Sequence, residues 1–228
     1  PNFRLRQSLI ECNVPTGPWR SPGHSAYCWA YQSFFDEVAL AAERDQLEFR
    51  LDLLSKAYGE PPLDLERTAG TLRKAAEAAG WGRDPGPNRG LGLAFHFDHG
   101  SFVSHVAQVK AEGKRVTVEK FWSAADCGPV INLSGATNQV EGAIVDALST
   151  ANLELTFSGG AIEQSNFHDY MLATHDQAPE VECHFIQSDF PPMGMGEPPI
   201  APATPAMTNA IFAATGVRIR EQPWSKAG

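Results

Sequence analysis

Cysteine is scarce in this sequence, and the few cysteines present are far apart. Among the 228 residues they are Cys12, Cys28, Cys127 and Cys183, with no CxxC pair. Zinc and iron–sulfur sites need several thiolates at short, regular spacings, so neither kind of site is predicted. The simplest interpretation is that these cysteines serve as small buried hydrophobic residues.

Basic residues are in the minority. The sequence has 18 Lys and Arg residues and 27 Asp and Glu residues, which gives a formal net charge of −9 and an isoelectric point near 5.2. Because nucleic-acid phosphates are bound by clustered positive charge, no nucleic-acid partner is expected. No apolar run approaches the roughly 20 residues that cross a bilayer, and no secretory leader is recognisable, so no membrane span is expected. The chain opens at Pro1, from which we expect that its true beginning has been cut away.

Apolar residues make up 43% of the chain, enough for the core of one large domain or two small ones. In the first third they recur at helical spacing. Helices are predicted at 27–40, 47–54 and 65–79, with a break at 59–62 and an end at Gly80. The Gly- and Pro-rich stretch that follows is either a long surface loop or a boundary. Taking it as a boundary, we expect a helical segment at 1–85 and a second domain at 86–228.

Beyond this stretch the hydrophobic period changes to two, which is typical of strands. Strands are predicted at 91–97, 101–110, 115–124, 153–157 and 181–187. The short connection at 98–100 favours antiparallel pairing of the first two. Helices and antiparallel strands that are segregated along the chain predict an α+β fold, with mixed helices and an antiparallel sheet.

Two further helices are predicted from capping residues. Asn138, followed three residues later by Glu141, resembles a capping box at a helix start. The last helix has Thr204 as its expected cap, Pro205 in its first turn and Gly216 just past its end.

One carboxylate, Glu197, stands in an unusual loop of glycines and prolines, PPMGMGEPP, that leads into the last helix. Glycine lets the backbone approach another group closely, and proline holds a loop without a ladder of hydrogen bonds. The residues alone leave two interpretations open. Glu197 is either an acid fixed against a bulky ligand or, more commonly, a solvated loop carboxylate.

Histidines do not predict a metal site. His96 and His99 flank the expected turn at 98–100, where neighbouring side chains need not converge.

Eight segments occur in an order that is informative as a set. They are PWRSPGHS, SFFDEVALAAERDQLEFRLDLL, RGLGLAFH, ADCGPVINL, NQVEGAIVDAL, EQSNFHDY, MGMGEPPIAPATPAMTNAIF and ATGVRIREQPW. Together they closely resemble the C-terminal part of the molybdopterin-binding large subunit in the xanthine dehydrogenase and aldehyde oxidase family of molybdenum hydroxylases. Within that family the sequence looks most like the beta subunit of isoquinoline 1-oxidoreductase-type bacterial enzymes. The resemblance covers nearly the whole chain.

The resemblance implies a molybdenum ion held by the dithiolene of a pterin cofactor, with the cytosine dinucleotide form as one option. It also implies hydroxylation of an N-heterocycle or an aldehyde with an oxygen from water. In this family a glutamate of the GxGEPP loop takes the proton from the metal-bound hydroxyl, and Glu197 occupies that position, with Gly196 beside it as a cofactor contact. These roles agree with the demand that a base lie within hydrogen-bond reach of the proton it removes.

Other positions also match cofactor-binding residues of the family. Gln139, in NQVEG, matches a glutamine whose amide hydrogen-bonds the pterin. Trp19, Arg20 and Ser21 match the segment that lines the metal site. Without the resemblance, Gln139 reads as an ordinary helix residue and Arg20 as a surface arginine. Xanthine-oxidising members have a phenylalanine before this arginine and a glycine after it, which puts a purine substrate in doubt.

Part of the family's cofactor cradle, a GQG-type loop, is not found in this sequence, and neither is an iron–sulfur signature. The resemblance therefore implies two partners, the remainder of the large subunit and a small iron–sulfur subunit that carries the iron–sulfur clusters. An isolated chain would then be inactive towards its small-molecule substrate. The alternative is a non-catalytic structural or cofactor-binding fragment of such a complex. Bacterial periplasm and cytoplasm both remain open as locations.

Overall fold

A computed structural model describes residues 4, 6, 8, 11, 14–58, 63–113 and 115–224, and it shows the expected change from helices to strands along the chain. The helices are α1 (His24–Ala41), α2 (Gln46–Ser55), α3 (Leu65–Ala79), α4 (Leu133–Ala151) and α5 (Ile200–Thr215), with a short 3-10 helix, η1 (His175–Gln177). The strands are β1 (Arg89–Asp98), β2 (Ser101–Glu112), β3 (Arg115–Asp126), β4 (Phe157–Ser158), β5 (Ala161–Ile162) and β6 (Glu180–Phe185). The predicted α+β class is confirmed.

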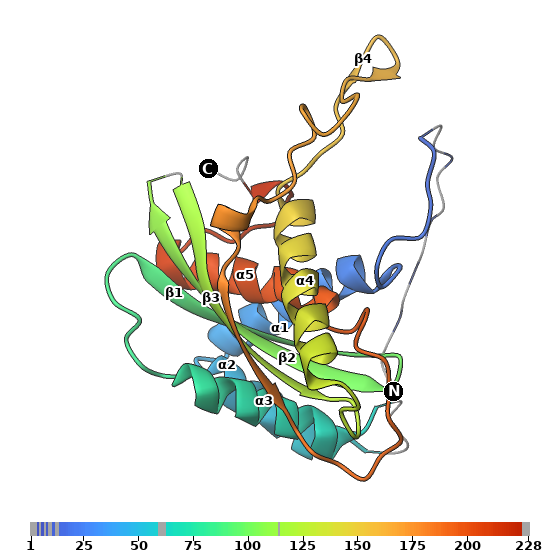
Figure 1. Ribbon diagram of the computed structural model, residues 1–228. Coiled ribbons are helices and arrows are strands. Elements are labelled where there is room, and N and C mark those ends of the chain that lie inside the picture. Colours follow the sequence, from blue (N-terminus) through green and yellow to red (C-terminus); the bar gives the residue numbers. More distant parts are fainter. Residues whose placement is uncertain are drawn as a thin grey trace.

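The main sheet has four strands in the order β1-β2-β3-β6 (Figure 1). The first three form an antiparallel meander, as predicted, whereas β6 pairs with β3 in parallel. A parallel pair needs a crossover connection, and here the connection runs through α4 and the small β4–β5 hairpin, which projects from the rest of the molecule (Figure 1). The predicted break at 59–62 lies outside the described residues.

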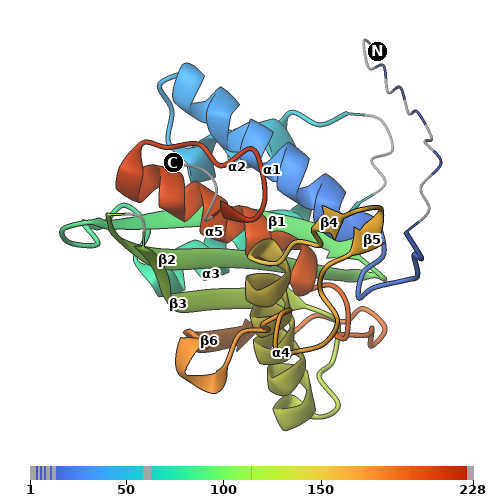
Figure 2. The same ribbon diagram turned by 90° about the horizontal axis from the view of Figure 1, so that it is seen from above.

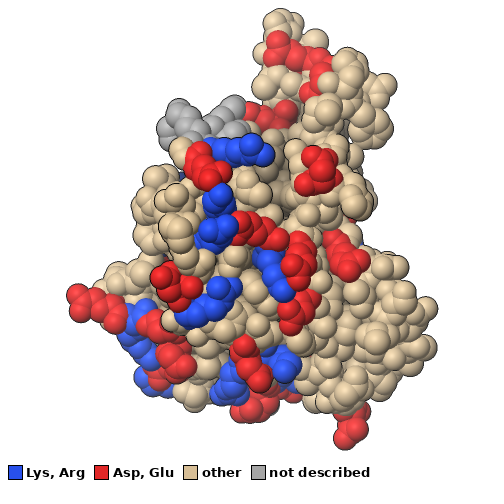
Figure 3. Space-filling model, turned by 60° about the vertical axis from the view of Figure 1, so that its left-hand side comes forward, with Lys and Arg blue, Asp and Glu red and all other residues tan. Residues whose placement is uncertain are grey.

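Helices cover both faces of this sheet (Figure 2). Because side chains alternate along a strand, neighbouring residues enter different cores. Leu93, Val106 and Trp122 pack with α3. Ala94, Val103, Ala107 and Phe121 belong to the larger core, to which α4 and α5 contribute Ile144 and Met207. Acidic and basic side chains are interspersed on the face shown in Figure 3.

Helix α5 lies very close to β1. A side chain at Gly92 would place its Cβ 2.2 Å from the Ala210 nitrogen and 2.3 Å from the Ala206 oxygen, so only glycine fits there. Gly90 is equally crowded by the same helix. The Asn209 side chain adds a hydrogen bond from Nδ2 to the Leu93 carbonyl, at 3.2 Å. The glycines of RGLGLAFH therefore let a helix lie directly on a strand.

Two helices begin earlier than predicted. Asn132 caps α4, accepting a hydrogen bond from the Gly135 nitrogen at 2.8 Å, so Asn138 lies inside the helix. Helix α5 begins at Ile200, so Thr204 is not its cap, and Pro205 lies within it. Both starts were missed because an equally good capping residue or a proline-rich turn precedes the expected one.

Most of 153–157 is not strand, since β4 holds only Phe157 and Ser158. The ends at Gly80 and Gly216 are confirmed, both with left-handed backbone. The division into 1–85 and 86–228 stays a prediction.

Cys28 and Cys127 are buried, as predicted, and Cys183 is half-buried. Burial raises the pKa of the Cys28 thiol to about 12, which keeps it protonated. Cys12 lies outside the described residues. Among the helices of the described part, none has the length and apolar character required to cross a bilayer.

Candidate active site

Arg20 brings three distant segments together at one place. Its Nε donates to the carbonyl oxygen of Gly196. Its Nη2 donates to the main-chain oxygen and to Oε1 of Gln139, both at 2.9 Å, and its Nη1 donates to Asp146 at 2.9 Å. Each nitrogen of the guanidinium is thus bound to a protein acceptor. Arg20 therefore connects the segment before α1 with α4 and with the loop before α5.

Helices position the segments that contain Gln139 and Glu197. Gln139 is an exposed residue in the second turn of α4. Glu197 stands just before α5, and its carbonyl accepts the Ile200 N–H at 3.1 Å. Behind this loop, the buried His105 of β2 lies with Nε2 2.8 Å from the Pro199 carbonyl oxygen. The loop is therefore anchored both by the helix that follows it and by the core of the sheet.

The carboxylate of Glu197 is held at both oxygens. Oε1 accepts the main-chain N–H of Ser21 at 3.1 Å, and Oε2 lies 3.1 Å from Nε2 of His99. The side chain is 35% exposed, so it is neither buried nor freely solvated. Two polar groups therefore fix the position of this carboxylate at a partly open surface.

Ser21 and His99 are in turn oriented by Asp98. The Ser21 hydroxyl donates to Oδ2 of Asp98 at 2.6 Å, and Nδ1 of His99 lies 2.7 Å from Oδ1. Ser21 and His99 both have positive φ, 56° and 48°, a conformation that glycine adopts more readily. Strained residues of this kind cluster at functional sites.

Asp98 and His99 are the site residues that sequence reasoning missed. The Asp98–Gly100 turn was recognised as a hairpin turn, but only the tertiary fold shows that this turn lies against Glu197. The side chains of His96 and His99 have different partners, since His96 contacts His24 and Tyr31.

The surface around these residues has room for a bulky group. A Cβ at Gly194 would have no atom within 4 Å, and the Trp19 ring is 57% exposed. The Gln139 amide nitrogen has no hydrogen bond to a described residue, although its oxygen is bound to Arg20. An amide donor, an exposed aromatic ring and an open glycine loop suit a flat, polar-edged ligand such as a pterin.

Comparisons with known proteins point to one family. Residues 35–179 match the sequence model of the molybdopterin cofactor-binding domain. This range includes Gln139 but neither Arg20 nor Glu197.

Similarity to curated proteins extends over nearly the whole chain. A membrane-bound aldehyde dehydrogenase of Gluconacetobacter polyoxogenes, whose name specifies pyrroloquinoline quinone, is 33% identical over 96% of this chain and 30% of its own length. The isoquinoline 1-oxidoreductase subunit beta of Brevundimonas diminuta is 29% identical over 97% of this chain and 28% of its own. The chain thus spans less than a third of the length of either relative.

Solved structures share the fold. The aldehyde oxidoreductase of Desulfovibrio gigas matches with a TM-score of 0.71 at 13% identity, over 90% of this chain and 40% of that one. Quinoline 2-oxidoreductase of Pseudomonas putida 86 matches with a TM-score of 0.51 at 25% identity, over 54% of this chain and 17% of that one.

Proposed function

The chain belongs to the molybdopterin cofactor-binding domain family, and from this premise we propose that it is part of a molybdenum hydroxylase that oxidises an N-heterocycle or an aldehyde with oxygen from water. One relative named as an aldehyde dehydrogenase and another named as an isoquinoline 1-oxidoreductase subunit support this substrate class. The observation that supports the proposal is the convergence of Gln139 and the Gly196–Glu197 loop on Arg20 and Ser21. These residues are far apart in the sequence, and the resemblance assigns all of them to one cofactor site.

The open surface around Gln139 and Gly196 would hold the cofactor. The amide nitrogen of Gln139, which has no hydrogen bond to a described residue, would donate to the pterin edge, and the exposed Trp19 and the glycine loop would line the cofactor. Arg20 acts mainly by fixing these segments, because its nitrogens are already bound to protein oxygens. When bound, the molybdenum–pterin cofactor supplies the two-electron redox chemistry.

Glu197 would act as the base. The Ser21 N–H holds Oε1 and the His99 ring lies beside Oε2, and each carboxylate oxygen has a second lone pair that could accept a proton. His99 lies beside Oε2, and its ring is oriented by the buried Asp98. A base held in this way needs no side-chain rearrangement before it takes the proton.

Further parts of the same protein would complete the site. Large apolar side chains are exposed on several elements, among them Tyr27 and Phe34 on α1, each 62% exposed, and Ile131 before α4 at 83%. We propose that the remainder of the large subunit covers such surfaces and supplies the missing cofactor loop. A small iron–sulfur subunit would carry the electrons away, and the cytosine dinucleotide remains one option for the cofactor.

The experiment replaces Glu197 by Gln in the intact protein. Gln keeps the size and shape of Glu but does not accept a proton at neutral pH. Turnover per bound molybdenum should fall by at least about a hundredfold, the lower range for loss of a general base, while molybdenum and pterin contents stay near the wild-type level. The exposed Glu163, replaced by Gln, is the matched control and should change neither quantity.

Two outcomes would contradict the proposal. Near-normal turnover per molybdenum in the Glu197→Gln protein would remove Glu197 from the role of base. An intact wild-type complex without molybdenum or pterin would instead favour a non-catalytic fragment or, if pyrroloquinoline quinone were found, the cofactor named for the aldehyde dehydrogenase relative.

A further inference from the structure

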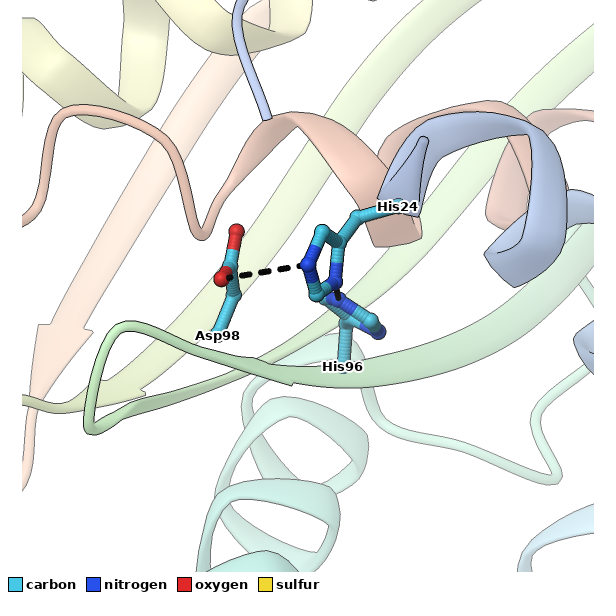
Figure 4. A group of neighbouring side chains, drawn as sticks. All are labelled: His24, His96 and Asp98. Carbon is cyan, nitrogen blue, oxygen red and sulfur yellow. Dashed lines mark hydrogen bonds and ion pairs between the residues drawn. The ribbon is translucent and has the colours of Figure 1, made fainter. Parts of the chain in front are cut away.

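A group of potential metal ligands, His24, His96 and Asp98, lies beside the candidate active site and shares Asp98 with it. His24 is the first residue of α1, and His96 and Asp98 are two residues apart on β1, so that both belong to the same side of that strand. Figure 4 shows the His24 ring placed between the other two side chains. Nδ1 of His24 lies 2.8 Å from Nε2 of His96, and its Nε2 lies 3.7 Å from Oδ1 of Asp98.

We infer that His24, His96 and Asp98 form a binding site for a divalent transition-metal ion of the zinc type. One donor atom from each of the three lies within 4.8 Å of the others. Nitrogen and oxygen ligands bind zinc at about 2.0 to 2.2 Å, which places donors of one ion roughly 3 to 4 Å apart. The two spacings start from different nitrogens of His24, so a shared ion requires the partly exposed His24 ring to turn until one nitrogen faces both His96 and Asp98. Two imidazoles and one carboxylate are a donor set for zinc or ferrous iron rather than for calcium or magnesium.

The burial of His96 favours this assignment. His96 is only 7% exposed, so its position is fixed by packing.

The ligands also have the outer partners that metal sites require. The Tyr31 hydroxyl lies 2.6 Å from Nδ1 of His96. With the His96 proton on Nδ1 and donated to Tyr31, the lone pair on Nε2 faces the ion. Ser21 and His99 hold the two oxygens of Asp98 at 2.6 and 2.7 Å. The His24 side chain is 44% exposed, which gives an ion an entry path and leaves coordination positions open to water.

The competing account is a chain of hydrogen bonds without metal. In that account Tyr31 donates to His96, and His96 donates to His24. The two accounts place the His96 proton on different nitrogens and differ in whether the protein holds a metal. The inference does not depend on the proposed hydroxylase function, because none of the three ligands is assigned to the pterin or to the base.

The test measures zinc in the intact protein. After treatment with a chelator, the wild-type protein and its variants are equilibrated with Zn²⁺, and zinc and molybdenum per chain are determined by mass spectrometry. The variant is His24→Ala, chosen because His24 is partly exposed and its loss should leave the fold intact. The control is His168→Ala, whose side chain is 73% exposed and lies in a distant loop.

One zinc per chain is expected in the wild-type and His168→Ala proteins. His24→Ala should weaken zinc binding at least about a hundredfold, and Tyr31→Phe about tenfold to a hundredfold, as for loss of an outer partner. Molybdenum content should not change. Anomalous scattering at the zinc edge should place the ion between His24 and His96. Zinc binding that is equal in the wild-type and His24→Ala proteins, or a wild-type protein that binds no zinc, would overturn the inference.

Discussion

The contact between α5 and β1 and the surface around Arg20 are built by opposite means. The first is buried and depends on the absence of side chains, since Gly90 and Gly92 let the backbone of β1 lie against the backbone of α5. The second depends on charged and polar side chains that are partly exposed, with Arg20 18% and Glu197 35% exposed. The two regions are joined because α5 begins just after Glu197. The close packing and the polar surface therefore meet in the segment that runs from Glu197 into α5.

The largest effect on stability should come from adding a side chain in the contact between α5 and β1. Gly92→Ala would place a Cβ within 2.2 Å of the Ala210 nitrogen. Because the crowding atoms belong to the α5 backbone and not to a flexible side chain, the free energy of unfolding should fall by more than about 3 kcal/mol, the upper end for an overpacked core. Denaturant unfolding measures this, with Gly17→Ala as control because its Cβ would meet no atom within 4 Å. Equal stability of the two variants would show that the α5–β1 contact is adaptable.

His105, which contacts the loop between Glu197 and α5, should make the free energy of unfolding depend on pH. Burial lowers the pKa of His105 to about 4, although its bond to the Pro199 carbonyl opposes the shift. Between pH 6.5 and 4 the unfolded chain binds a proton that the folded chain does not, so stability on the order of 3 kcal/mol is lost as pH falls through this window. In His105→Gln the slope of unfolding free energy against pH should be smaller. An unchanged slope would mean that His105 titrates normally in the folded protein.

A smaller effect is expected at the polar region. Arg20→Lys keeps the charge but loses the fork that reaches Gly196, Gln139 and Asp146 together. Cofactor retention should weaken by about 2 kcal/mol, typical of lost hydrogen bonds to a charged group. Molybdenum content after dialysis reports this loss, while unfolding should change less. Arg220→Lys is the control, since Arg220 is exposed and forms its ion pair with Glu37, far from this site in the sequence. Equal molybdenum loss in both variants would contradict the special role of Arg20.

The smallest effect should follow from Gln139→Ala. This change removes one neutral amide, and the main-chain oxygen that Arg20 also uses is retained. Cofactor retention should weaken by about 1 kcal/mol, the worth of a single neutral hydrogen bond. The neighbouring exposed Asn138, replaced by Ala, should have no effect. If both variants retain cofactor equally, the amide of Gln139 does not contact it.

Local patterns were enough to predict most elements. The helix that ends at Gly80 and the hairpin at Asp98–Gly100 both follow from turn chemistry and periodicity in a short window. The starts of α4 and α5 were missed because several residues in each region are competent to begin a helix. Tertiary packing selects among them, and a short window does not contain that information.

The site was predictable only in part. The resemblance pointed to Arg20, Gln139 and Glu197, and the structure brings them together. His24, Asp98 and His99 were not found, because their contacts join the start of α1, the end of β1 and the loop before α5. No sequence spacing encodes such contacts. The positive φ of Ser21 is likewise invisible until the chain is folded.

The parallel pairing of β6 with β3 has a consequence for the order of folding. The β1–β2–β3 meander brings together residues that are close in sequence, whereas Lys120 and Glu180, which pair across β3 and β6, are 60 residues apart. Closing such a long loop is slow, so we expect the meander to form first and β6 to join late. Until then one edge of β3 is open to pairing with other chains. Since the Glu197 loop and α5 follow β6 in the chain, we expect the polar site to be completed at the end of folding. A cofactor would then bind to a protein that is already nearly folded.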